Sequence, residues 1–255
     1  MPQKKYDFII PIGWGCLNTH NLRLNKLQRE SLPFDWIWFE GIPMVTHYIK
    51  TKFSEFMKKE NLLFLRHNGD ADIYRDIHDK SEFWHDFMIG ETFEKAYDRN
   101  YQKYQRRISR LFYHINRAHS VLWVRYVRIF PNQEKTEEQF MFEKEQLSDE
   151  QVIEEFRELQ NLYPEKKFNL LLIYTYNEPH HKQEYDLTPD IHVCEFYNDE
   201  TLGWKGNEKV IAEILQNYDL TYSAKIYYAL NTLLFKIKKC VLGLFSKQRF
   251  KSQND

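Results

Sequence analysis

Cys16 is the residue whose setting most favours chemistry. It follows an apolar segment predicted as a strand, residues 6–12, and a turn at Gly13 and Gly15, and it begins a predicted helix. The two glycines allow a sharp turn and leave room for a ligand to approach. The dipole and free N–H groups of a helix N-terminus stabilise a thiolate, which predicts a thiol pKa below the usual value of about 8.5, and they can bind an oxyanion. The alternative is an ordinary buried cysteine.

The three cysteines, Cys16, Cys194 and Cys240, are widely separated and form no CxxC pair. This spacing excludes a disulfide framework and a zinc-finger type of site. His180 and His181, with glutamates close by, match no known ligand spacing and indicate a solvated loop. We therefore expect neither a metal nor another cofactor.

The composition is that of an ordinary globular protein. The chain has 255 residues, 42% of them hydrophobic and 29% charged, which suffices for one large domain with its own core. Its net charge of −1, from 36 Lys and Arg against 37 Asp and Glu, disfavours a general nucleic-acid binder. The N-terminus lacks the apolar length of a signal peptide, and no run of about 18 apolar residues occurs, so a cytoplasmic location is expected.

Strands and long helices alternate along the chain. Further strands are predicted at residues 62–65, 120–126, 169–175 and 191–197, and helices at 16–28, 43–59, 91–119, 149–163 and 207–217. The polar residues 66–90 are predicted as loops. Ser148 and Gln151 form a capping box in the strand–helix–strand succession over 120–175, which predicts a parallel βαβ unit. We predict one three-layer α/β domain over residues 1–220 with a mainly parallel sheet. Such folds place their sites at the carboxyl ends of strands, and Cys16 follows the carboxyl end of the first predicted strand.

The N-terminal third of the chain carries a family resemblance. The segment IPIGWGCLNTHNLRLNKLQRESLPFDWIW resembles the signature of a bacterial domain family of unknown function described as putative papain-like cysteine peptidases, and the shared positions are Gly13, Cys16, Leu22, Pro33, Phe34, Asp35 and Trp36. FWHDF at 83–87, KYQRRISRL at 103–111, SVLWVRY at 120–126 and GWKGN at 203–207 extend the resemblance over residues 6–217. It implies a cysteine nucleophile at Cys16. It also implies a papain-like α+β fold, the alternative to our α/β prediction.

The resemblance further implies a histidine base with a third group that orients the imidazole. His85 is the first candidate because it lies in the matching FWHDF element beside Asp86; the alternative is a surface-loop histidine capped by its neighbour. His192 is the second candidate, with Asp190 or Asn198 to orient it. The alternative there is a strand histidine beside a buried cysteine.

Other residues near these motifs are candidates for substrate binding, among them Gly13 and Gly15. Asp35 is either a turn former or a hydrogen-bond partner of the loop at the cysteine, and Trp36 either stacks on a substrate ring or caps the core. Arg125 lies within an apolar strand, so it must contact an anionic group or pair with a buried carboxylate.

These candidates together predict a thiol-dependent hydrolase or acyl transferase acting on a small-molecule, glycan or peptide substrate. The alternative function is a non-hydrolytic protein of bacterial surface-polysaccharide biosynthesis, in which Cys16 lines a glycan or phosphate pocket.

The segment 221–255 has a different character from the rest of the chain. Residues 222–251 contain seven Lys and Arg and no carboxylate, and apolar residues recur at three- and four-residue intervals. Lysines within the apolar run prevent it from spanning a bilayer easily. A basic amphipathic helix is therefore predicted, docked peripherally on the inner face of a membrane. The alternative is that the apolar stripe packs on the domain or on a second subunit.

Overall fold

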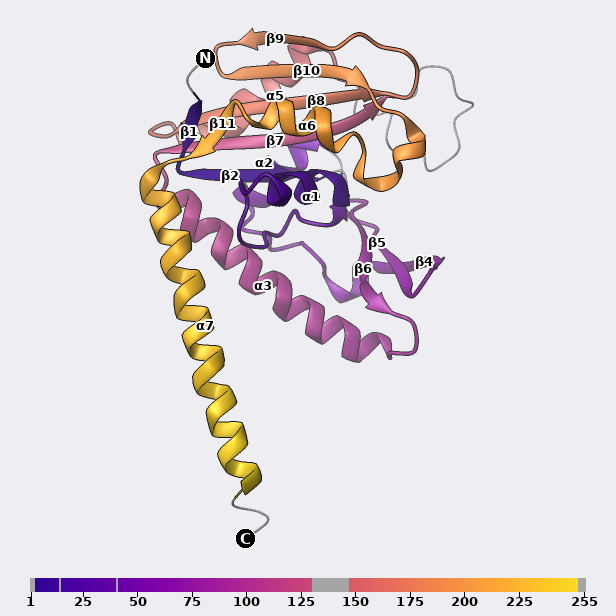
Figure 1. Cartoon of the computed structure of the whole chain (residues 1–255). Helices are drawn as coiled ribbons and strands as arrows, with labels where there is room; N and C mark the ends of the chain where they lie inside the picture. Colours follow the sequence, from indigo (N-terminus) through magenta and orange to yellow (C-terminus); the bar gives the residue numbers. More distant parts are fainter. Residues whose placement is uncertain (1–2, 14, 40, 130–146, 252–255) are drawn as a thin grey trace. The chain divides into compact units, whose positions relative to one another are not determined.

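The computed structural model describes all of the chain except residues 1–2, 14, 40, 130–146 and 252–255 (Figure 1). Side chains are not described at residue 200 and from residue 238 onward. It divides into two compact units, Met1–Asp219 and Leu220–Asp255, which are described separately. The structure is mixed α/β, with three sheets and six α-helices in the described part.

The largest sheet has five strands and contains the predicted βαβ unit. Its order is β2 (Phe8–Ile12), β7 (Ser120–Ile129), β8 (Lys167–Tyr176), β10 (Ile191–Tyr197) and β9 (Gln183–Thr188). The first four strands are parallel, and helix α5 (Asp149–Asn161), with the predicted capping box, connects β7 to β8. Strand β9 is antiparallel to β10, so the sheet is mixed.

A second sheet of four strands is entirely antiparallel and corrects the prediction of a mainly parallel architecture. Its order is β3 (Ile37–Trp38), β6 (Glu82–Met88), β5 (Ala71–Asp76) and β4 (Leu62–Asn68). The prediction of loops over 66–90 is therefore wrong. These strands are polar because much of β4 faces solvent, while Ile73, Phe83 and Phe87 supply a buried apolar face.

The helices follow the predicted apolar periodicity, with shifted ends. They are α1 (Cys16–Leu24), α2 (Gly41–Lys50), α3 (Phe93–Arg117), α5, α6 (Glu208–Leu215) and α7 (Tyr222–Lys251). Helix α2 ends earlier than predicted because Lys52 and Phe53 adopt positive φ values, which a helix cannot contain. Two short strands missed by the sequence analysis, β1 (Lys4–Tyr6) and β11 (Tyr218–Leu220), pair with each other, and two 3₁₀ segments occur at η1 (Lys59–Asn61) and η2 (Glu200–Lys205).

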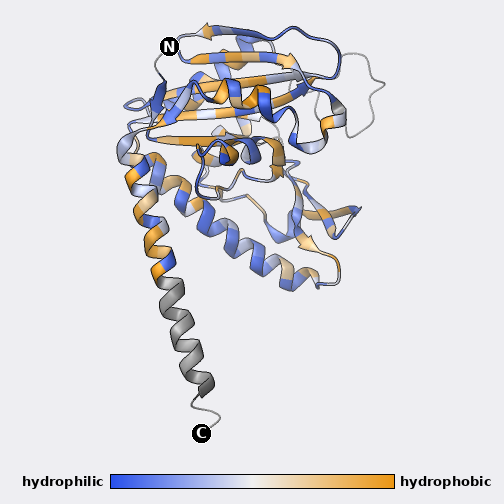
Figure 2. Cartoon of the chain, in the orientation of Figure 1, coloured by the Kyte–Doolittle hydropathy of each residue, from blue (hydrophilic) through white to orange (hydrophobic). Residues whose placement is uncertain are grey.

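Helices cover the five-stranded sheet on both faces (Figure 1). Successive side chains of each strand point to opposite faces of the sheet, so both faces carry apolar side chains that pack against helices. Helix α1 contacts α6, β2 and β7, whereas α2 contacts α5 and β2. The central strands are largely hydrophobic and α3 is hydrophilic over much of its surface (Figure 2). Residues at the ends of the parallel strands therefore meet α1 on one face and α2 on the other.

The second unit consists mainly of α7, which confirms the helix predicted from Tyr222 onward. Among the described residues, no helix combines the length and the apolar character needed to cross a bilayer.

Candidate active site

The site is built on the end of β2 and the start of α1. Strand β2 ends at Ile12, and α1 begins at Cys16, whose side chain is half-buried. The Sγ atom of Cys16 lies 2.8 Å from Nε2 of His85, an exposed residue of β6. The structure thus brings the predicted nucleophile and the first candidate base within hydrogen-bond distance.

A bulge in β6 shapes the other side of the site. One residue of β5, Ile73, faces three residues of β6, Trp84, His85 and Asp86, between two regular stretches of pairing. Bulges interrupt the alternation of side chains along a strand. All three β6 residues therefore border one pocket with Cys16.

The two glycines before Cys16 make close approaches to neighbouring side chains. Gly13 and Gly15 have φ values of +52° and +67°. A Cβ atom at Gly15 would lie 2.5 Å from Nε1 of Trp38, and one at Gly13 would lie 2.5 Å from the ring of Phe39. The space beside these glycines is filled by protein side chains, so both positions require glycine for the packing of the turn.

Replacing Gly15 by alanine is therefore expected to slow alkylation of Cys16 by iodoacetamide and to destabilise the fold by more than the ~1–2 kcal/mol of left-handed backbone strain. Gly69→Ala is the matched control, because Gly69 has a φ value of +57° and open space around it. Denaturant unfolding and alkylation rates measure both effects. If Gly15→Ala and Gly69→Ala lose the same stability and Gly15→Ala leaves the alkylation rate unchanged, the contact between Gly15 and Trp38 affects neither the fold nor the thiol.

The acidity of the Cys16 thiol differs from the prediction. Burial raises its pKa to about 11, although the residue stands at a helix N-terminus. The isolated thiol is therefore protonated at neutral pH, and it needs an adjacent base to become a nucleophile. Cys194 is fully buried with a pKa raised by burial to about 12, and the side chain of Cys240 lies outside the described residues.

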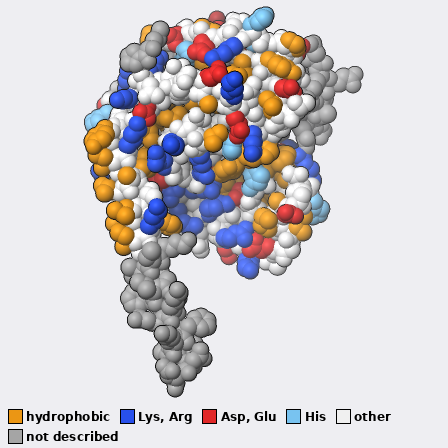
Figure 3. Space-filling view, in the orientation of Figure 1, with side chains coloured by type: hydrophobic (Ala, Val, Ile, Leu, Met, Phe, Trp, Pro, Cys, Tyr) orange, Lys and Arg blue, Asp and Glu red, His pale blue; other side chains and the backbone are white. Residues whose placement is uncertain are grey.

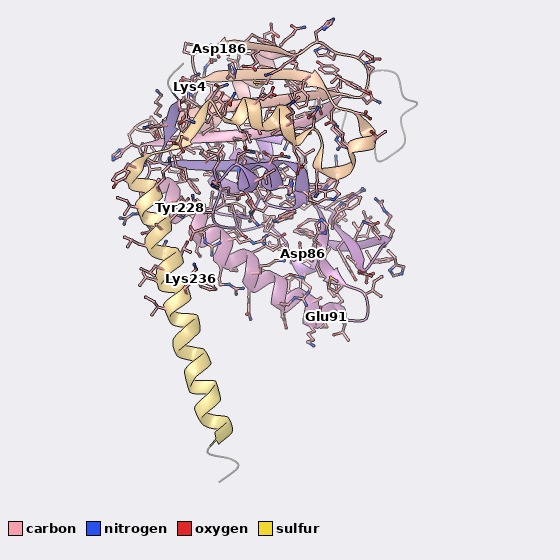
Figure 4. All side chains as sticks on the ribbon, in the orientation of Figure 1. Lys4, Asp86, Glu91, Asp186, Tyr228 and Lys236 are labelled. Carbon is pink, nitrogen blue, oxygen red and sulfur yellow. The ribbon has the colours of Figure 1, made fainter. Side chains whose placement is uncertain are left out.

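Asp86 does not orient His85. Its carboxylate accepts hydrogen bonds from Lys103 and, at 2.8 Å, from the hydroxyl of Tyr104, both on α3. Figure 4 labels Asp86 beside this helix. The His85 ring instead meets the ring of Trp36 edge to face, at 6.2 Å between centroids. Within the described residues no carboxylate is hydrogen-bonded to His85. The arrangement is a Cys–His pair whose imidazole meets an aromatic ring edge to face.

The second candidate base, His192, lies elsewhere. Its Nδ1 is 2.7 Å from the carboxylate of Asp186 on β9, which Figure 4 shows at the opposite end of this unit from Asp86. Ligand atoms of His192, Glu184 and Cys194 lie within 4.8 Å of one another, a set that could hold a metal ion. The structure therefore does not bring His192 to Cys16, and neither of the two partners expected to orient it does so.

Asp35 fixes the loop that carries Trp36. It is fully buried and accepts hydrogen bonds from Arg23 at 2.8 Å, from Gln28 at 2.9 Å and from the N–H of Leu32 at 3.1 Å. The next residue, Trp36, has a φ value of +66° and lines the pocket at Cys16. Asp35 thus stabilises the turn, the first of the two roles considered from the sequence, and Trp36 faces the site.

Arg125 does not line this pocket. It is 2% exposed, donates from Nη1 to the carbonyl of Ile12 at 3.0 Å, and lies 5.6 Å from the centre of the Phe39 ring. Because side chains alternate along β7, Arg125 faces α2 whereas Arg128 faces α1 and the Cys16 pocket. Arg125 therefore supports the turn before Cys16 from behind.

The pocket itself has a volume of about 680 Å³. Its walls include four tryptophans and three cations: Trp36, Trp38, Trp84, Trp204, Lys103, Arg107 and Arg128. The cations were missed by the sequence analysis, although the spacing of Lys103 and Arg107, one helical turn apart, placed them on one face of α3.

Comparison with known proteins supports the family resemblance. The model of a family described as "putative papain-like cysteine peptidase" matches residues 7–158, more than half of the chain, so the chain belongs to this family. The match ends before the GWKGN segment, to which the resemblance had been extended. No curated protein matches the chain, and no solved structure matches it.

Proposed function

We propose that this member of the family is a thiol-dependent hydrolase or acyl transferase, with Cys16 as nucleophile and His85 as base. The observation that carries the proposal is the distance of 2.8 Å between Sγ and Nε2. His85 accepts the thiol proton as Sγ attacks a substrate carbonyl carbon, and the imidazolium then gives that proton to the leaving group. Water or another acceptor releases the acyl group from the resulting thioester. Small-molecule, glycan and peptide substrates are all compatible with this step.

The start of α1 is suited to binding the negative charge of the intermediate. The helix begins at Cys16 itself, and Gly15 before it has no side chain to cap the first N–H groups. These groups, with the positive end of the helix dipole, stabilise an oxyanion formed at the carbon bonded to Sγ.

The test is acylation by p-nitrophenyl acetate together with alkylation by iodoacetamide. We expect a burst of one p-nitrophenolate per chain that Cys16→Ser abolishes, and selective alkylation of Cys16 over Cys194 and Cys240 at neutral pH, measured by peptide mass spectrometry. A burst that persists in Cys16→Ser, or equal alkylation of all three thiols, would exclude Cys16 as the nucleophile.

We further propose that α7 binds the anionic inner face of a membrane. The helix is continuous from Tyr222 to Lys251, and apolar residues such as Ile226, Leu230 and Leu233 recur along it at helical spacing. Its cations have no acidic residue among them in the sequence. Each cation near an anionic surface contributes about 1 kcal/mol.

Full-length protein is therefore expected to sediment with phosphatidylglycerol vesicles and to a much smaller extent with phosphatidylcholine vesicles. The double variant Lys225→Gln, Lys236→Gln is expected to bind the anionic vesicles about 30-fold more weakly. A double variant of two lysines in the first unit, Lys167→Gln and Lys209→Gln, is the control. Binding that is absent, or equal in all three proteins, would contradict the proposal.

A further inference from the structure

One wall of the Cys16 pocket is a rigid aromatic surface. Trp38 of β3 and Trp84 of β6 stack with ring centroids 4.9 Å apart and an interplanar angle of 14°. The guanidinium of Arg66 covers Trp84 at 5.1 Å, and the side chain of Glu82 accepts a hydrogen bond from its indole N–H at 2.8 Å. The pair is thus held in place before any ligand arrives, and both rings border the pocket close to the thiol.

The pocket also has an excess of positive charge. Lys103, Arg107 and Arg128 line it, against one carboxylate, that of Asp86, which is paired with Lys103. Figure 3 shows Lys and Arg side chains gathered on this face over the region of α3, with few acidic side chains among them. Asp86 is taken up by Lys103, so it does not balance the charge of Arg107.

The arginines are suited to binding an anion. Arg107 is half-buried, and its guanidinium lies 5.2 Å from the centre of the Tyr104 ring. It forms no hydrogen bond or ion pair with any residue in the described part of the chain. Arg128 is half-buried, and its guanidinium donates a hydrogen bond to the carbonyl of Gly203 at 3.3 Å. Guanidinium groups bind carboxylates and phosphates through paired hydrogen bonds, and the aromatic walls lower the local dielectric constant.

Resting on the proposed function, we propose that the substrate is an acyl compound with a second, anionic group, a carboxylate or a phosphate, which Arg107 and Arg128 bind. Its apolar or ring-shaped part lies against Trp38 and Trp84. The anion fixes the substrate so that its acyl carbon is presented to Cys16.

Two alkylating agents that differ in charge test this assignment. Iodoacetate is anionic and iodoacetamide is neutral, and both alkylate a thiolate with release of iodide. The ratio of the iodoacetate rate to the iodoacetamide rate at Cys16, divided by the same ratio for 2-mercaptoethanol, is expected to be about ten or more. Arg107→Gln and Arg128→Gln are each expected to lower it several-fold. Arg106→Gln, which removes the same charge from an exposed neighbouring position on α3, is expected to leave it unchanged.

Protection experiments distinguish the two kinds of anion. Phenyl phosphate and benzoate each combine a ring with an anion, and we expect at least one to slow alkylation of Cys16 by iodoacetamide in the wild-type protein but not in Arg107→Gln. The anion that protects better identifies the group.

A normalised ratio near one in the wild-type protein, or a ratio that Arg107→Gln and Arg106→Gln change equally, would overturn the anionic substrate. If Cys16 is also not selectively alkylated by iodoacetamide, the proposed function itself fails. The neutral reagent therefore separates the two failures.

Discussion

Replacement of His85 by glutamine is expected to slow alkylation of Cys16 by iodoacetamide at neutral pH by about 100-fold. The thiol has a pKa raised to about 11 by burial, so without an adjacent base almost none of it is ionised at neutral pH. The residual rate of His85→Gln should rise continuously with pH towards about 11, because only hydroxide then removes the proton. The wild-type rate should already be high at neutral pH. Stopped-flow or mass-spectrometric rates over this range measure both profiles.

The matched control is His192→Gln, the same substitution at the second candidate histidine. His192 is bound to Asp186 on β9 and does not contact Cys16, so its loss should leave the rate and its pH profile unchanged. If His192→Gln lowers the rate and His85→Gln does not, the assignment of the base is wrong. A wild-type profile that rises only near pH 11 would show that the contact at 2.8 Å does not activate the thiol.

Local sequence patterns were sufficient to predict the part of the site that contains Cys16, because that part is built from one continuous stretch of chain. The apolar strand, the two glycines and the helix after them placed Cys16 at the carboxyl end of β2. The same kind of pattern predicted β7, α5 and β8, because a buried parallel sheet requires continuous apolar runs and its crossover helix requires an amphipathic one. Neither pattern depends on distant contacts.

The other half of the site depends on β6, where such patterns fail. This strand has solvent on one side and a bulge at residues 84–86, so neither alternation nor an apolar run marks it in the sequence. Recognition of FWHDF identified His85, but it could not show that the Asp86 carboxylate points to Lys103 and Tyr104. The acidity of Cys16 was predicted with the wrong sign because its helix N-terminus is visible in the sequence and its burial is not.

The Pro-Phe-Asp-Trp element connects the fold to the site. Phe34 is buried in the core beside Phe39 and Phe53, and Trp36 stands in the pocket against His85. Between them, Asp35 secures the turn, and the guanidinium of its partner Arg23 lies 5.5 Å from the Trp36 ring. Asp35 is therefore the residue through which the core determines where Trp36 is placed, and the Trp36 ring in turn meets the imidazole of His85 edge to face.

Asp35→Ala is expected to lower the free energy of unfolding by about 2–3 kcal/mol, because it leaves the buried amide of Gln28 and the N–H of Leu32 without their acceptor and Arg23 without its counter-charge. It is also expected to slow alkylation of Cys16, because Trp36 is no longer held. Asp98→Ala, an exposed position on α3, is the control and should change stability by less than about 0.5 kcal/mol.

The pH dependence of this loss has a definite sign. Burial raises the pKa of Asp35 above its ordinary value of 3.8, opposed by Arg23 and by hydrogen bonds from Gln28 and Leu32. The folded state therefore holds the proton more tightly than the unfolded state does, and the contribution of this carboxyl to stability falls as the pH rises above 3.8 through its folded-state pKa. The difference between wild type and Asp35→Ala in urea unfolding should accordingly be larger near pH 5 than near pH 8. A difference that grows with pH would mean that Arg23 outweighs burial, and Asp35 would then stabilise the turn chiefly through its charge.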